Sequence, residues 1–226
     1  SDEGTIATGY GIHASSSSGF AIEENYFTKY AHAPASIYVG ITIAESQSTN
    51  QVYRNTFEGL SYGNYAEGKN WSGINTWQGL AYYCNENNSN WRDIEVEYDP
   101  INPSGIQSEM GSTEMAAGNT FTSNADNNFN NLGDHEVEYF YYTGNPPEYP
   151  EVVYYVSREP VGIENQCLSH YGGGSGGDDN IGLVLSPSEK QLTELDFATH
   201  TTDYNNVKTL YDNLKDGGNT DATLSD

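Results

Sequence analysis

Short segments in which apolar and polar residues alternate recur along the first half of the chain at a fixed interval. Three of them can be laid over one another with a register of 30 residues: 19–27, 49–57 and 79–87. Their apolar positions coincide, because Ile22 aligns with Val52 and Tyr82. Alternation over so few residues is typical of β-strands with one buried and one exposed face. A fixed period of this length indicates stacked repeats, each of which buries its inner face against its neighbours.

A second series of positions recurs beside the first. Each member is an isoleucine that follows a glycine: Ile12, Ile41, Ile74 and Ile106. Stacking would place these isoleucines above one another, and it would likewise place Ile22 above Val52. Together the two series predict an all-β fold, a parallel β-helix built from stacked coils of about 30 residues.

An asparagine ends each of the aligned segments, at Asn25, Asn55 and Asn85. Asparagine tolerates the left-handed backbone conformation that a tight bend needs, and stacked amides bond to the copies above and below. We therefore expect an asparagine ladder, although asparagine is also common in loops. Two departures stand out: Asn87 replaces the phenylalanine of the first two segments, and a fourth corner, at Asn119, follows only after 34 residues.

The pattern divides the chain into four parts. Coils occupy residues 1–131 and end at a polar corner, 125–131. Residues 132–170 hold two β-rich runs separated by prolines, which predicts a Tyr/Pro-rich β cap over the open end of the coils. A Gly-rich linker spans 171–187. Residues 188–226 contain short amphipathic helices, the expected start of a further helical region.

The chain is strongly acidic. Its 226 residues include 32 Asp and Glu against 8 Lys and Arg, a net charge of −24. This balance excludes nucleic acid as a partner, because binding to phosphates needs a basic surface. The acidity indicates either a solubility surface in salty surroundings or carboxylates that coordinate Ca²⁺. We favour the first interpretation, because no dense carboxylate cluster has the spacing of a calcium loop.

One short stretch matches a calcium-binding repeat. Residues 173–178 read Gly-Gly-Ser-Gly-Gly-Asp, which makes Asp178 and Asp179 weak calcium candidates. That pattern works in tandem arrays and occurs here once, so a linker is the favoured interpretation. We predict no cofactor, with calcium as the alternative.

The sequence contains no signal peptide and no apolar run of membrane-spanning length, so direct membrane insertion is not expected. The residues with which the sequence begins and ends predict that it is a piece of a larger mature protein. Two cysteines are present, Cys84 and Cys167. An oxidising compartment would let them pair and tie the third coil to a distant segment. The alternative is two free, separately buried thiols.

Catalytic chemistry is not indicated. No zinc-protease, nucleophile-elbow, P-loop or Cys-x-x-Cys motif occurs, and the five histidines lack ligand spacing. We therefore predict no catalytic residue and no metal ligand. A polysaccharide hydrolase would need carboxylates that meet across a groove. The candidates are Glu23, Glu24, Glu45 and Glu58, and an acidic solvated face explains them equally well.

Aromatic residues are the best candidates for binding. The tryptophans fall within one coil and its loops, with several tyrosines nearby: Trp71, Trp77, Trp91, Tyr62, Tyr65, Tyr82 and Tyr83. Aromatic rings on a rigid surface stack on sugar rings or anchor a protein partner. The candidate ligand-binding residues are Trp71, Trp77, Trp91 and Tyr82. The alternative is that tyrosines cover the outer strand faces and tryptophans fill corners.

Four further stretches complete a pattern that covers most of residues 10–220: Gly79–Asn85, Asp93–Val96, Gly105–Gln107 and Ala117–Phe121. This pattern resembles the right-handed parallel β-helix regions of large proteins that Bacteroidota export through the type IX secretion pathway. The resemblance implies a right-handed β-helix within a secreted, extracellular or cell-surface protein. Its partners would be other domains of the same large chain, surface proteins or glycans.

The sequence leaves two functions open. The first is a non-catalytic surface module, a structural spacer or adhesin segment of a larger secreted protein. The second is a carbohydrate-active β-helix that binds or hydrolyses a neutral polysaccharide on its aromatic residues. Two carboxylates meeting in a groove would favour the hydrolase.

Overall fold

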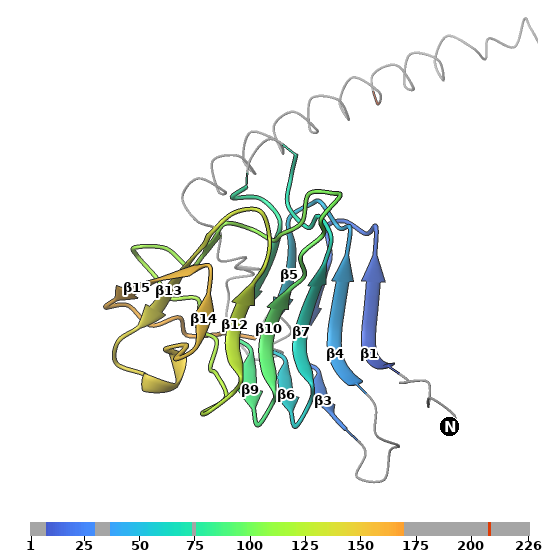
Figure 1. The fold of residues 1–226 in the computed structure, drawn as a ribbon. Coiled ribbons are helices and arrows are strands. Elements are labelled where there is room, and N and C mark those ends of the chain that lie inside the picture. The colour runs from blue at the N-terminus through green and yellow to red at the C-terminus, as the bar shows by residue number, and fades with distance from the viewer. Residues whose placement is uncertain (1–7, 30–36, 74–75, 170–207, 209–226) are drawn as a thin grey trace, which may run out of the picture. The chain divides into compact units, whose positions relative to one another are not determined.

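The structure is a computed structural model that describes residues 8–29, 37–73, 76–169 and 208. The chain divides into two compact units, residues 1–184 and 185–226. Lys208, which is helical, is the described residue of the second unit. The predicted linker therefore lies outside the described residues, as does the predicted helical tail apart from Lys208. The described part of the first unit is all-β, with parallel sheets (Figure 1).

The largest sheet has six parallel strands, ordered as they occur in the chain. They are β1 (Thr8–Ser15), β4 (Ile37–Ala44), β7 (Tyr62–Glu67), β10 (Arg92–Val96), β12 (Asn127–Asn131) and β14 (Val153–Tyr154). Neighbours in this sheet are separated in sequence by the strands of other sheets. The chain thus returns to the six-stranded sheet once in each pass, and we call each pass a repeat (Figure 1).

Three smaller sheets take up the rest of each repeat. One contains β2 (Ala21–Glu23), β5 (Asn50–Tyr53) and β8 (Leu80–Tyr83), and another contains β3 (Tyr26–Thr28), β6 (Thr56–Glu58) and β9 (Glu86–Asn88). The third contains β11 (Glu109–Met110), β13 (Val137–Tyr142) and β15 (Val156–Val161). All of these pairs are parallel too.

The predicted register of 30 residues holds in the two sheets of the first three repeats. Ile22 pairs with Val52, and Val52 pairs with Tyr82. Val52 and Tyr82 are fully buried, because each inner face is covered by the repeats on both sides. Phe27 pairs with Phe57, and Asn87 follows at the position where the sequence departs from phenylalanine.

The isoleucine series holds for its first two members only. Ile12 pairs with Ile41, but the next strand places Asn64 beside Ile41. The sequence interval between paired residues is shorter from β4 to β7 than from β1 to β4. The extra residues of this repeat follow β7 and do not precede it. Ile74 lies outside the described residues. Ile106 belongs to another sheet region, where the Gln107 N–H donates to the Leu80 carbonyl at 3.1 Å.

The asparagines form a continuous ladder through four repeats. The N–H and Nδ2 of Asn25 both donate to Asn55 Oδ1 at 3.0 Å, and those of Asn55 donate to Asn85 Oδ1 at 3.0 and 3.2 Å. Asn85 makes the same pair of bonds to Asn119 Oδ1, at 2.9 and 3.1 Å. Each amide oxygen thus satisfies a corner N–H of the preceding repeat, which a buried backbone group requires.

The left-handed backbone conformation falls one residue before each asparagine, not on it. Glu24, Arg54 and Cys84 have φ values of 57°, 52° and 57°, and Gly118 has 77°. The prediction that asparagine itself adopts this conformation is therefore wrong. The preceding residue makes the bend, and the asparagine amide then lies in the stack, where it bonds across repeats.

The segment predicted as a polar corner, 125–131, is largely strand. Asn127–Asn131 forms β12 and pairs with β10, so the six-stranded sheet continues past this point. Its asparagines are tolerated in a sheet because their amides are bonded, for example Asn128 Nδ2 to the Thr122 carbonyl at 2.8 Å. The prolines that follow form a short 3₁₀ helix, η1 (Pro146–Glu148), between β13 and β14.

Cys84 and Cys167 form a disulfide across 83 residues of sequence. It joins the end of β8 to the segment that follows β15. A hydrogen bond from the Tyr53 hydroxyl to the Leu168 carbonyl, at 2.8 Å, holds the same segment against the neighbouring repeat. The bridge therefore fastens a late segment to the early repeats, as the paired alternative predicts.

Candidate functional site

The outer face of the six-stranded sheet presents a regular array of side chains. Ile41, Asn64 and Ile94 lie at matched positions on successive strands and are fully buried on the inner face. Because side chains alternate along a strand, the next residue of each strand lies on the outer face. These residues are Thr42, Tyr65, Glu95 and Asn130.

Three aromatic rings meet on this outer face, and we call Tyr62, Tyr65 and Trp91 the aromatic cluster. The Tyr62 ring lies edge-on to Tyr65, with centroids 5.4 Å apart, and edge-on to Trp91 at 5.6 Å. Trp91 is 50 % exposed, and both tyrosines are half-buried. Since they stand on or beside paired strands, the rings are held rigidly while part of each surface stays accessible.

A shallow groove of about 290 Å³ runs beside the aromatic cluster. Its lining combines aromatic, aliphatic, hydroxyl and carboxylate groups: Thr8, Tyr10, Ile37, Val39, Thr42, Tyr62, Tyr65, Glu67 and Glu97. The lining comes from four neighbouring strands and their ends, so the groove crosses the strands. It has the mixed composition of a small-molecule site, apolar surface with a few oriented polar groups.

Arg92 organises one side of the aromatic cluster. Its guanidinium lies 4.5 Å from the centroid of the Trp91 ring and pairs with Glu95 at 2.8 Å and Asp126 at 3.2 Å. Asn130 Nδ2 donates to both oxygens of Glu95 at 3.0 Å. Burial raises the pKa of Glu95, and the bonds from Asn130 and Arg92 oppose that rise. The role of the Glu95 carboxylate is therefore to hold the Arg92 guanidinium in place.

Two carboxylates stand side by side at the groove. The Glu97 N–H donates to the Ala66 carbonyl at 2.9 Å, which sets Glu97 beside Glu67 of the adjacent strand. Burial and the charge of Glu67 raise the pKa of Glu97, against a hydrogen bond from Tyr65 that lowers it. Burial, with help from these carboxylates, also raises the pKa of the Tyr65 hydroxyl, so Tyr65 remains a hydrogen-bond donor.

Asp93 lies on the same strand but inside the protein. Its oxygens accept bonds from the Thr122 N–H at 2.8 Å, the Thr122 hydroxyl at 2.6 Å and Asn128 Nδ2 at 3.0 Å. Asn90 Nδ2 donates to it as well, at 3.2 Å. Burial raises the pKa of Asp93, and these donors only partly offset it. This carboxylate joins repeats together and does not face a ligand.

Stability is expected to rise as the pH falls through the raised carboxyl pKa values of the folded chain towards the unfolded values. Burial raises the pKa of Asp93, Glu95, Glu97 and Glu148 above unfolded values of about 4. In that window the folded chain binds more protons than the unfolded chain, so the free energy of unfolding grows as pH drops. Their contribution is complete below the unfolded pKa and is lost as pH rises through the folded pKa. Asp99, which is exposed and whose pKa is lowered, acts weakly in the opposite direction.

Thermal unfolding at constant ionic strength measures this slope. Asp93→Asn removes one of the titrating groups, so it should flatten the slope as well as lower the melting temperature. A melting temperature that falls steadily from pH 8 to 5 would contradict the assignment of these raised pKa values.

The structure separates the four predicted ligand-binding residues. Trp91 belongs to the aromatic cluster, whereas Tyr82 is 0 % exposed and cannot touch a ligand. Trp71 packs edge-on against His135, with centroids 5.5 Å apart, and beneath Lys69. Trp77 is exposed in a turn after β7. The predicted tryptophan group is therefore divided between places with different neighbours.

The carboxylates of the groove were not among the predicted residues, although the sequence holds a signal for them. Tyr62 pairs with Arg92, and Tyr65 pairs with Glu95, each 30 residues further along. Glu67 and Glu97 keep the same interval. Extending the 30-residue alignment from the asparagine corners to residues 62–67 would therefore have brought these residues together.

The four glutamates proposed for a hydrolase do not gather at one groove. Glu24 pairs with Arg54 at 2.8 Å, Tyr26 bonds to Glu58, and Glu45 lies beside Gly68. Glu23 pairs in register with Tyr53. Within the described ranges, no three His, Cys, Asp or Glu side chains are placed to hold a metal ion. Asp178 and Asp179 lie outside those ranges.

The described histidines have separate surroundings. His13 lies against the Tyr10 ring, with centroids 5.4 Å apart, while His135 Nε2 donates to the Ile106 carbonyl at 2.7 Å. Burial lowers the pKa of His135, which keeps its ring neutral. His32, His170 and His200 are not among the described residues.

No helix in the described part of the chain has the length and apolar character needed to cross a membrane. Comparison of the chain with known protein families, with curated proteins and with solved structures gives no match. The geometry of the aromatic cluster and its groove is therefore the basis on which a function can be assigned.

Proposed function

We propose that this chain is a non-catalytic, extracellular module of a secreted surface protein, with the right-handed parallel β-helix fold, and that it acts as an adhesin segment. The observation that carries the proposal is the aromatic cluster beside its groove on the outer face of the six-stranded sheet. The ligand that suits this surface is a neutral polysaccharide. The module's rigidity would come from the asparagine ladder.

The β-helix assignment draws support from the order of the strands. Each sheet takes one strand from each successive repeat, always in parallel, with steps of about 30 residues between paired positions such as Ile22 and Val52. Side-chain ladders bond the corners of successive repeats. Stacking of this kind is what repeat architectures of this period use to bury a shared core.

A neutral sugar polymer fits the chemistry of the groove. The exposed ring surface of Trp91 and the half-buried tyrosines offer apolar faces for pyranose rings. Glu67 and Glu97 offer acceptors for sugar hydroxyls, and the Tyr65 hydroxyl offers a donor. An anionic polymer would meet the repulsion of a chain with a net charge of −24.

The disulfide supports an extracellular location. Cys84 and Cys167 are paired, and disulfides persist in oxidising compartments and are rare in the reducing cytosol. The acidic surface agrees with salty surroundings, where screening reduces self-repulsion. Both features fit the secreted proteins that the sequence resembles.

Binding is favoured over hydrolysis because the best-placed carboxylates have structural partners. Glu95 holds Arg92, and Asp93 accepts four hydrogen bonds inside the protein. One observation supports hydrolysis as the second candidate: Glu67 and Glu97 stand on adjacent strands about 5 Å apart at the backbone, and the pKa of Glu97 is raised. A glycosidase needs two carboxyl groups that face the same groove.

Calorimetry with soluble neutral polysaccharides would test the proposal. We expect Tyr62→Ala and Trp91→Ala each to weaken binding at least about tenfold, since each removes a ring from the binding surface. Trp77→Ala is the matched control, because Trp77 is exposed but lies outside the aromatic cluster. Equal losses in all three variants, or none, would contradict the assigned site.

The same variants separate binding from hydrolysis. A binding module should leave the polysaccharide chain length unchanged during long incubation, and Glu97→Gln should change affinity only modestly. If the wild-type chain shortens the polysaccharide and Glu97→Gln abolishes that activity, the second candidate replaces the first.

A further inference from the structure

A second groove, of about 460 Å³, lies beside β9, the last strand of the sheet that β3, β6 and β9 form (Figure 1). We call it the second groove, and its lining includes Glu86, Asn88, Ser89, Thr120, Ser123 and Pro147. None of its lining residues lines the groove beside the aromatic cluster. The proposed function therefore leaves this surface without a role.

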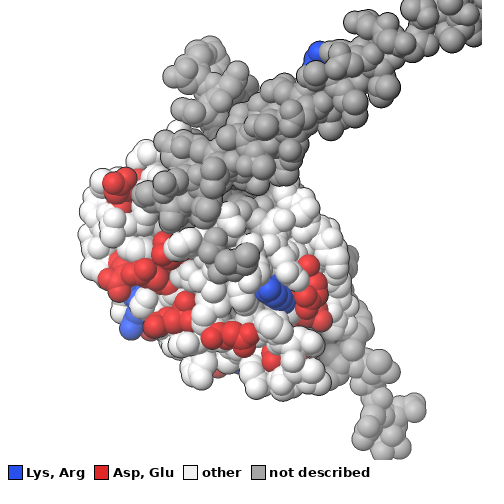
Figure 2. Space-filling model, turned by 90° about the horizontal axis from the view of Figure 1, so that it is seen from above, with Lys and Arg blue, Asp and Glu red and all other residues white. Residues whose placement is uncertain are grey.

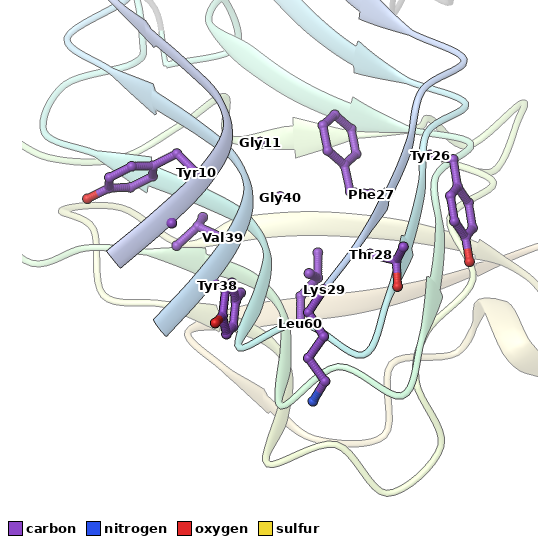
Figure 3. Close-up of a pocket in the computed structure, with 11 residues that line it drawn as sticks. Tyr10, Gly11, Tyr26, Phe27, Thr28, Lys29, Tyr38, Val39, Gly40 and Leu60 are labelled. Atoms are coloured by element: carbon purple, nitrogen blue, oxygen red, sulfur yellow. The ribbon is translucent and has the colours of Figure 1, made fainter. Parts of the chain in front are cut away.

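The second groove lies where the third repeat departs from the first two. In the first two repeats a phenylalanine ring lies beside a glycine of the six-stranded sheet, and Figure 3 shows Phe27 beside Gly11. Asn87 takes the place of the ring in the third repeat, and its Nδ2 donates to the Thr120 carbonyl at 3.0 Å. Pairing between β9 and the next repeat is limited to the bridge from Glu86 to Thr120. The surface opens into the groove after this bridge.

The lining offers hydrogen-bonding groups that are free for a ligand. The side chains of Asn88, Ser89 and Ser123 are exposed and make no hydrogen bond within the described ranges. An amide and two hydroxyls both donate and accept hydrogen bonds. Pro147 adds an exposed apolar surface beside them. This combination suits a ligand that carries many hydroxyl groups.

The charge of the lining favours a neutral ligand. Figure 2 shows acidic side chains gathered in patches on one face of the molecule. In the second groove Glu86 is the one charged lining residue, and its carboxylate can accept a hydrogen bond from a ligand hydroxyl. An anionic ligand would meet the repulsion of a chain with a net charge of −24, and an uncharged ligand would not.

Ser89 adopts a backbone conformation that disfavours a side chain. Its φ is 56°, and the residue 30 positions earlier is Gly59, whose φ is 66°. Glycine reaches this conformation without the steric cost that serine incurs. Residues held in such conformations cluster at functional sites. Because the preceding repeat builds the same corner with glycine, the hydroxyl at the groove is what serine adds at this place.

Trp91 lies between the two binding surfaces. β9 leads directly into β10 at this corner (Figure 1). Trp91 follows Ser89 by two residues, a span of no more than about 7 Å. The Trp91 carbonyl accepts a hydrogen bond from the Asp126 N–H at 2.9 Å, and Asp126 follows Ser123 by three residues. A sugar chain that crosses the Trp91 ring can therefore contact Tyr62 on one side and Ser89 on the other.

We propose that the second groove is a further subsite for the polysaccharide, which binds the hydroxyls of the sugar residues next to those on the aromatic cluster. This inference rests on the proposed function and adds to it. The aromatic cluster binds the faces of sugar rings, and the second groove recognises their hydroxyl groups. The ligand is then the interior of a linear, uncharged chain, because it must extend past Trp91 in both directions.

Calorimetry with cello-, xylo- and manno-oligosaccharides of increasing length tests the second groove. We expect affinity to rise about tenfold between ligands that cover only the aromatic cluster and ligands that also reach the second groove. Asn88→Ala with Ser89→Gly should remove this gain and leave the affinity for the shortest ligands unchanged. Ser16→Gly is the matched control, because Ser16 is an exposed serine with a φ of 51° that lines neither groove.

The shortest ligand that binds separates this inference from the proposed function. If Trp91→Ala weakens its binding while the double variant keeps the gain with length, the second groove is not a subsite and the aromatic cluster still is. An affinity that does not depend on chain length would also overturn the second groove. If Trp91→Ala leaves every affinity unchanged, the proposed function fails and the second groove fails with it.

Discussion

Replacing Asn85 with alanine is expected to lower the free energy of unfolding by about 3–5 kcal/mol. Asn85 Oδ1 accepts bonds from the N–H and Nδ2 of Asn55, and its Nδ2 donates to the Val52 carbonyl at 2.8 Å and to Asn119 Oδ1 at 3.1 Å. All of these groups are buried, so removing the amide leaves several of them without partners. Each orphaned buried group costs about 1–3 kcal/mol, and the truncation adds a small cavity.

Asn25→Ala is the matched control for this prediction. Asn25 makes the same kind of bond, its Nδ2 donating to the Glu23 carbonyl at 2.8 Å, but it is only half-buried. Water can replace its amide there, so we expect a loss of about 1 kcal/mol. Urea unfolding followed by circular dichroism measures both variants. Equal losses of unfolding free energy in the two variants would show that burial does not strengthen the hydrogen bonds of the asparagine ladder.

Removing the disulfide by Cys84→Ala with Cys167→Ala is expected to cost about 4 kcal/mol. The bridge spans 83 residues of sequence, and closing so long a loop removes much of the entropy of the unfolded chain. The segment around Cys167 should also loosen, because it is then held by hydrogen bonds such as those from the Tyr53 hydroxyl to the Leu168 carbonyl and from Asn165 Nδ2 to the Ala116 carbonyl.

Reduction of the wild-type chain supplies the comparison for this second prediction. If loop closure is the cause, the reduced wild type and the double variant should unfold at the same urea concentration. Thiol labelling without reductant should leave the native chain unmodified. Two labelled cysteines, or unchanged stability after reduction, would contradict the structural role of the bridge.

The sequence predicts the stacking well where the loops keep a constant length. The alignment of Ile22, Val52 and Tyr82 reappears as paired strands, and the asparagine ladder runs through the predicted residues to Asn119. The prediction of the stacking fails where the length of the loops changes. Asn64 takes the place expected of Ile74, because the residues inserted after β7 move the later Gly-Ile pairs off the six-stranded sheet.

The candidate site is less predictable from the sequence. Trp91 lies on the outer face as a binding residue should, but Tyr82 does not, and its alignment with the buried Val52 already indicates a place in the core. Whether a given strand residue faces outward depends on the register of each strand. Tyr62 and Glu97 can be placed only once their strands are paired.

The residues that make and lock the corners are different from those on the outer face of the six-stranded sheet, and this has a consequence for protein engineering. Left-handed residues make the corners, buried amides lock them, and neither depends on what projects from the six-stranded sheet. Of the outward positions Thr42, Tyr65, Glu95 and Asn130, which lie about 4.8 Å apart, Tyr65 is the one that is not buried, so a substitution of Tyr65 should disturb the packing least.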